Sequence, residues 1–160
     1  MEDLLKKVSE YQLFNFLLTG TLLAFLISKT TPVNLLYDNI LVAVFIYYFI
    51  GLVLSRVGSL VIEPLFKTLR IVKYASYKEY LKASEKDSKI DILSQENNIY
   101  RTLIGTFLVY GFVYAFCELW PNLLESTWLP IVVAGVGLVL FSLSYRKQTK
   151  YITTRVNRHN

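Results

Sequence analysis

The chain has 160 residues, of which 54% are hydrophobic and only 18% are charged, and its formal net charge at pH 7 is +5. A soluble domain of this length could not readily bury so much apolar surface, and so short a chain closes only one core. The single cysteine and the single histidine provide neither an intrachain disulfide nor a ligand set for a metal. The composition therefore predicts one all-α membrane domain that needs no metal and no cofactor.

Four apolar segments are each long enough to cross a hydrocarbon layer of about 30 Å as a helix, for which about 20 residues suffice. We expect the four crossings at residues 12–28, 36–56, 100–118 and 128–145. Each crossing should be helical because a bilayer interior offers no water to an unpaired backbone group. Acidic residues near the start, such as Glu2 and Glu10, argue against a cleaved export signal, so we expect the first segment to be retained.

The positions of Lys and Arg predict the orientation of these helices. The stretch from Arg56 to Arg101 holds nine of the 17 cations and the tail from Arg146 to Arg158 holds five, whereas the two outer turns hold only Lys29. Cytoplasmic loops carry the excess of cations in membrane proteins. We therefore expect the connector (64–98), the tail (146–160) and both termini in the cytoplasm, and we expect a bacterial inner membrane because the compact chain shows no targeting signal.

The connector has the pattern of an amphipathic helix. Its cations recur at spacings of three and four residues, while Tyr74, Tyr77 and Leu81 repeat on another face. Ser94, followed by Glu96, is typical of a helix start, so the third crossing helix should begin there. The predicted basic stripe of connector and tail consists of Lys67, Arg70, Lys78, Lys82, Lys86, Lys89, Arg146, Lys147 and Lys150.

This basic stripe has three interpretations. It can anchor on anionic lipid, where each cation near the surface contributes about 1 kcal/mol. It can also be the docking face for an acidic soluble protein. The third interpretation, contact with nucleic acid, is weakened by the acids between the lysines, such as Glu79, Glu85 and Asp87, because they interrupt a phosphate-tracking surface. We therefore expect lipid and a soluble protein as partners, and no direct nucleic-acid contact.

Arg56 and Glu63 bracket the inner end of the second crossing, seven residues apart and so on roughly the same helical side. Ionisable groups at membrane depth are costly and usually face protein or water. Near the cytoplasmic end, however, a long side chain reaches the headgroups at small cost. The pair is either an anchor that orients the helix or part of a polar path or switch.

Tyrosines fall inside the predicted crossings, and a buried phenol hydroxyl needs a hydrogen-bond partner. We expect Tyr47, Tyr48 and Tyr110 to point into the bundle or toward polar residues of the first helix. Packing is one interpretation of these tyrosines, and a permeation or ligand path is the other.

Small residues recur at four-residue spacing, which allows close backbone approach where no hydrophobic force drives helices together. The predicted packing positions are Gly20, Gly51, Ser55, Gly111, Gly135 and Gly137. The pattern predicts tight helix packing, either within one subunit or between subunits.

Enzymatic chemistry finds no support, because no Ser/His/Asp or Cys/His set can be assembled around the terminal His159 and no G-x-x-x-x-G-K-S/T phosphate loop occurs. The sequence therefore favours a non-enzymatic membrane subunit that self-associates and presents its cytosolic helices to a soluble partner. One alternative is a signal-gated pore or membrane-disrupting effector with Arg56 and Glu63 at the gate. The other is an immunity protein against a pore-forming toxin.

The layout of four short helices, a helical connector (64–98) and a basic tail (146–158) resembles the membrane subunits of bacterial antiviral defence systems, the Kiwa membrane component among them. The resemblance implies a homo-oligomer, such as a tetramer, at the inner membrane. It also implies that this oligomer senses infection and recruits or restrains a soluble DNA-binding partner.

Overall fold

The computed structural model describes the backbone of residues 2–118 and 129–157, and the side chains of residues 10–117, 132 and 134–157. Every regular element in these ranges is a helix, which confirms the all-α prediction for the described chain. The elements are α1 (Glu2–Thr30), α2 (Ile40–Val57), the π-helical segment η1 (Gly58–Ile62), α3 (Glu63–Thr68), α4 (Tyr77–Lys86), α5 (Lys89–Glu118) and α6 (Leu129–Asn157).

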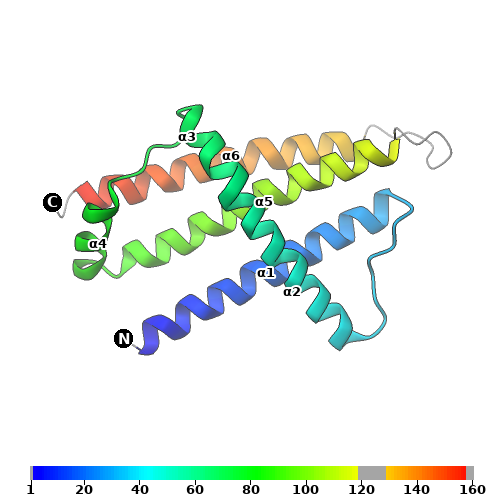
Figure 1. Cartoon of the computed structure of the whole chain (residues 1–160), viewed down its shortest axis with the longest axis horizontal. Helices are drawn as coiled ribbons and strands as arrows, with labels where there is room; N and C mark the ends of the chain where they lie inside the picture. Colours follow the sequence, from blue (N-terminus) through cyan, green and yellow to red (C-terminus); the bar gives the residue numbers. More distant parts are fainter. Residues whose placement is uncertain (1, 119–128, 158–160) are drawn as a thin grey trace.

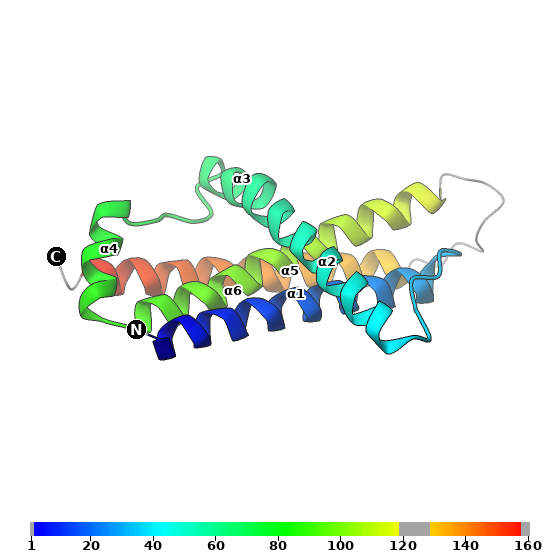
Figure 2. The ribbon, with the colours of Figure 1, turned by 60° about the horizontal axis from the view of Figure 1, so that its bottom comes forward.

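Three long helices, α1, α5 and α6, run lengthwise, and α2 crosses them obliquely (Figure 1). α5 and α6 form an antiparallel pair, whereas α1 runs in the same direction as α5. The N-terminus, α4, the first turns of α5 and the last turns of α6 lie at one end of the molecule, which we call the basic end (Figure 2). Residues 31–39 and the last turn of α5 lie at the opposite end.

Three segments of the described chain are long and apolar enough to cross a membrane: Glu10–Thr30, Ile40–Thr68 and Lys89–Cys117. Their outward side chains include exposed phenylalanines such as Phe45 and Phe112, as expected of surfaces that face lipid. The fourth predicted crossing, 128–145, coincides with the first part of α6, and several of its leading residues lie outside the described ones.

The second helix begins later and ends later than the predicted 36–56. Asn39 caps it, because Asn39 Oδ1 accepts hydrogen bonds from the amides of Leu41 (3.0 Å) and Val42 (3.3 Å). The helix then continues through η1 into α3, where Glu63 N–H donates to Gly58 O across the wider π turn. Pro64 therefore lies inside a continuous helical segment rather than at its end. The π turn lies immediately before this proline, which has no amide hydrogen to donate.

The predicted amphipathic connector is wrong as one continuous helix, because the chain leaves the helix after Thr68. Ile71 N–H donates to Phe66 O (2.9 Å) and Arg70 N–H to Lys67 O (3.0 Å), which is the Schellman arrangement that ends helices. Arg70 occupies the left-handed position of this motif with φ of 55°, where glycine is usual and any other residue costs about 1 kcal/mol. The basic stripe is therefore cut in two between Arg70 and Lys78.

The connector resumes as α4, whose first turn is fixed by a capping box between Ser76 and Glu79. The predicted helix start at Ser94 is wrong, because α5 already begins at Lys89 and Ser94 Oγ donates back to Ile90 O (2.8 Å). Asp87 Oδ1 accepts from the amide of Lys89 (3.1 Å) and fixes this earlier start. The predicted tail is also helical as far as Asn157, because it continues α6.

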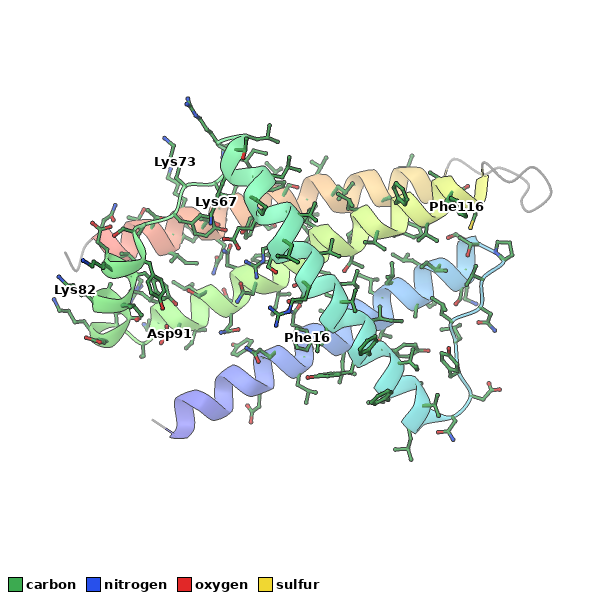
Figure 3. All side chains as sticks on the ribbon, in the orientation of Figure 1. Phe16, Lys67, Lys73, Lys82, Asp91 and Phe116 are labelled. Atoms are coloured by element: carbon green, nitrogen blue, oxygen red, sulfur yellow. The ribbon has the colours of Figure 1, made fainter. Side chains whose placement is uncertain are left out.

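α1 and α2 cross with their backbones in contact. A Cβ atom added to Gly20 would lie 1.8 Å from Tyr47 O, and one added to Gly51 would lie 1.9 Å from Phe16 O. Figure 3 shows Phe16 at this crossing. Only glycine fits at these two positions, so the structure places Gly20 and Gly51 where backbones meet.

The other predicted packing positions differ in how closely a neighbouring helix approaches them. A Cβ on Gly137 would meet the Phe107 ring at 2.4 Å, and one on Gly111 would make an ordinary 3.6 Å contact with Ala134. Within the described part of the chain, a Cβ on Gly135 would meet no atom within 4 Å, so this glycine makes no close helix contact there. Ser55 is half-buried. Gly58, which was not predicted, lets η1 approach Arg101 O, since a Cβ there would lie 3.1 Å away.

Candidate functional site at the basic end

A charged cluster joins α3 to α5. Arg101 Nη1 donates to Glu63 Oε2, and Lys67 Nζ donates to Glu63 Oε1 at 2.7 Å. The Arg101 and Glu63 side chains are only 15% and 23% exposed, so their charges are largely removed from water and depend on each other. Arg56, predicted to act with Glu63, is exposed instead. The sequence pattern does not reveal the role of Arg101, because Arg101 lies 38 positions from Glu63, beyond any local spacing rule.

Aromatic groups extend this cluster toward α6. The hydroxyls of Tyr74 and Tyr145 are hydrogen-bonded, and Lys67 Nζ lies 4.7 Å from the centre of the Tyr74 ring. The Tyr145 ring packs 5.8 Å from Phe66, centre to centre. Burial raises the pKa of Tyr74 above its ordinary value of 10, so this phenol stays protonated at neutral pH. The cluster therefore ties α3, the following loop and α6 into one joint.

Beyond this joint, α4 packs on the start of α5 and the end of α6. Four fully or largely buried residues form its apolar contact: Ala83, Ile90, Ile152 and Val156. We call α4 together with residues 89–98 and 146–157 the basic-end unit. Because α5 and α6 run without a break into this unit, it is rigidly connected to the helices of the bundle.

Polar contacts fix the position of α4 in the unit. The Tyr80 hydroxyl lies 3.1 Å from both Asp91 Oδ1 and Ser94 Oγ, and burial raises the pKa of Tyr80. Arg155 of α6 pairs with Asp87, which follows α4. Figure 3 shows Asp91 at the start of α5, close to α4. These contacts hold the inner face of α4 and leave its outer face exposed.

Buried polar residues also join α5 to α6 within the unit. Gln148 Nε2 donates to Glu96 Oε2 (2.8 Å), and Thr149 Oγ1 donates to Asn97 Oδ1 (3.1 Å). Gln148, Thr149 and Asn97 are buried, so these hydrogen bonds specify how the two helices align. Each joins residues 52 positions apart, and for this reason the sequence pattern did not reveal them.

The predicted basic stripe lies in several separate places. Lys67 belongs to the charged cluster, while Lys78, Lys82 and Lys86 lie on exposed positions of α4 and Lys89 is exposed at the start of α5. Arg70, Arg146 and Lys150 surround a cavity together with Lys73, and Lys147 lies outside it, 5.8 Å from the Tyr151 ring. Figure 3 shows Lys73 and Lys82 projecting away from the helices at different places.

The predicted tyrosines take part in packing. Tyr110 is fully buried and donates to Thr30 Oγ1 (3.2 Å), and Tyr47 donates to Leu35 O (3.3 Å). Tyr48 packs edge-to-face on Phe16 at 5.4 Å. Tyr110 therefore contacts a polar residue at the end of α1, whereas Tyr47 and Tyr48 contact Leu35 O and the Phe16 ring.

Other polar side chains of α1 make contacts of their own. Asn15 Nδ2 donates to Thr102 Oγ1 (3.3 Å), which links α1 to α5, and Thr19 donates to Asn15 O (2.7 Å). Thr21 is exposed. The interhelical Asn15–Thr102 contact lies one residue from Arg101, so polar contacts gather at this level of the bundle.

Among the residues that the structure describes, no three His, Cys, Asp or Glu side chains gather closely enough to hold an ion. What the arrangement does offer is charge, in the form of an exposed basic helix and a basic cavity beside a fixed joint.

Comparison with known proteins gives no relative: no family model, no curated protein and no solved structure matches this chain.

Proposed function

We propose that the protein is a non-enzymatic membrane adaptor that holds a helical docking surface just outside the bilayer and recruits or regulates an acidic soluble partner there. In this proposal four helices cross a bacterial inner membrane, and both termini and the basic-end unit lie in the cytoplasm. The supporting arguments are the apolar length of the helices and the cations gathered at the basic end.

The observation that carries this proposal is the outer face of α4. Tyr77 is 74% exposed and Leu81 is 42% exposed, with Lys78 and Lys82 beside them. An aromatic and an aliphatic side chain rimmed by cations suit a protein interface with an acidic partner. The inner face of α4 is fixed by the basic-end unit, so this surface is presented in one orientation.

The position of α4 favours a soluble partner over lipid. The last exposed aliphatic side chain of α6 is Leu143, whereas α4 packs on Ile152 and Val156. At about 1.5 Å per residue these contacts lie roughly 14–20 Å further along the helix. The headgroup layer on each side of the hydrocarbon is only about 5–8 Å thick. The lysines of α4 therefore stand beyond the headgroups.

Self-association would strengthen such docking. One protomer presents a single small surface, and several copies held side by side would bind one partner with an effective concentration in the millimolar range, without new contacts. We therefore include a homo-oligomer in the proposal, in keeping with the resemblance to Kiwa-type membrane subunits.

Site-specific photo-crosslinking tests the docking surface. A photoreactive amino acid replaces Tyr77 in the full-length protein in its native membrane. We expect an adduct with a soluble protein, and we expect the double variant Lys78→Glu/Lys82→Glu to lower its yield at least about tenfold, since each reversed rim charge opposes an acidic partner. The matched control is Lys147→Glu, an exposed cation on another helix, which should leave the yield unchanged.

Other adducts would count against the proposal. Crosslinks only to lipid would make α4 a membrane anchor, and crosslinks only between copies of the chain would make its outer face a self-interface. A soluble adduct with the same yield in wild type and double variant would show that the lysines do not select the partner.

A further inference from the structure

An open cavity of about 360 Å³ lies between the loop that follows α3 and the outer side of α6. Its lining consists of Arg70, Ile71, Val72, Lys73, Arg146, Lys150, Thr153 and Thr154. Half of these residues are cations and none is acidic. Within the described chain Glu63 pairs with Lys67 and Arg101, and Asp87 pairs with Arg155. None of the four cavity cations pairs with a carboxylate there.

The cations come from two segments that are held together independently of any ligand. Thr153 Oγ1 donates to Lys73 O (2.9 Å), which fastens the loop to α6. Arg70 lines the cavity from a left-handed backbone position, where glycine would relieve strain. A strained arginine in a cluster of unpaired cations points to a ligand for that cluster.

The cavity lies where apolar surface gives way to charge. Leu69, 58% exposed, directly precedes Arg70, and Leu143, 60% exposed, precedes Arg146 by three residues. Exposed leucines suit the hydrocarbon edge, so Arg70 and Arg146, the cations next to them, fall at the depth of phospholipid headgroups, and Lys150 lies about one turn further along α6.

We infer that this cavity binds the phosphate groups of an anionic phospholipid headgroup. Guanidinium groups offer planar pairs of N–H donors that match phosphate oxygens, and the two lysines add point charges. Basic pockets beside membrane helices suit headgroups that carry more than one phosphate. In this inference the stripe cations at the cavity bind a lipid headgroup, whereas the stripe cations on α4 bind the soluble partner of the proposed function.

The inference rests on the membrane placement in the proposed function but not on the docking of a partner to α4. Its test uses no soluble protein, so either idea can fail while the other stands.

The variant Arg70→Gly makes the test sharp, because glycine suits the left-handed backbone while the guanidinium group is removed together with its side chain. It is combined with Arg146→Gln, and Lys147→Gln is the matched control on the neighbouring α6 position. Each full-length protein is placed in nanodiscs of phosphatidylcholine with or without cardiolipin, and native mass spectrometry measures the cardiolipin retained. We expect the double variant to lower the apparent affinity roughly 25-fold, about fivefold for each cation, and the control to match wild type.

Three results would overturn the inference. One is equal cardiolipin retention by wild type and the double variant. Another is an equal loss in the Lys147→Gln control, which would indicate diffuse charge attraction. The third is binding of inorganic pyrophosphate in phosphatidylcholine nanodiscs that depends on Arg70 and Arg146 while cardiolipin is not retained, which would assign the cavity to a soluble phosphate.

Discussion

Replacing Gly20 by alanine should separate α1 from α2 and destabilise the protein by about 3 kcal/mol, the upper part of the range for overpacked positions. The added Cβ would lie 1.8 Å from Tyr47 O, and a backbone oxygen cannot turn aside as a side chain can. The helices must therefore move apart, which also removes the packing of Phe16 on Tyr48. The midpoint of thermal unfolding in mild detergent should fall by roughly 6–12 °C.

Gly135→Ala is the matched control for this prediction. It makes the same chemical change in α6, but its Cβ would meet no atom of the described residues within 4 Å. We expect its unfolding midpoint to equal that of wild type or to exceed it slightly, because alanine favours the helix. Equal midpoints for Gly20→Ala and Gly135→Ala would contradict the close crossing of α1 and α2.

Replacing Arg101 by methionine should destabilise the protein by about 2–4 kcal/mol. The variant leaves Oε2 of the largely buried Glu63 side chain without the guanidinium group that neutralises it. Lys67 still contacts the other carboxylate oxygen, so the loss should lie below that of a fully isolated charge. Unfolding in mixed detergent micelles measures this free energy.

The double variant Glu63→Gln/Arg101→Met separates the ion pair from general packing. Because it removes both charges, we expect it to be more stable than Arg101→Met alone. Arg56→Met serves as the control, since Arg56 is an exposed arginine in the helical segment that also carries Glu63. The change in unfolding free energy that it causes should stay within about 0.5 kcal/mol. Additive losses in the double variant would rule out coupling between Glu63 and Arg101.

The sequence predicted the parts of the fold that follow from local pattern. The apolar runs lie in helices because a helix satisfies its own backbone, and the glycines of the α1–α2 crossing were identified by their spacing to other small residues. The predicted helix bounds were less accurate where a single residue determines where a helix begins or ends. Asn39 delays α2, and the Schellman turn at Arg70 divides a connector whose periodicity suggested one helix.

The candidate site was only partly predictable, because its contacts join distant positions. The sequence groups the cations of the basic stripe by spacing, whereas tertiary folding distributes them among an ion pair, a helix face and a cavity. Arg101 and Gln148 resemble ordinary helix residues in the sequence. Their roles depend on α3 and α6 folding back on α5, and no local spacing encodes that arrangement.

Cysteine accessibility in intact bacterial cells tests the central claim, that the basic end lies on the cytoplasmic side of a membrane. Single cysteines replace Asn34, Ser84 or Thr154 in a Cys117→Ser background, and the cells are treated with a membrane-impermeant maleimide. Asn34 lies in the segment between α1 and α2, Ser84 in α4 and Thr154 near the end of α6. We predict labelling at position 34 in intact cells and labelling at positions 84 and 154 only after the membrane is opened. Labelling of position 84 from outside, or of positions 84 and 154 from opposite sides, would contradict the account.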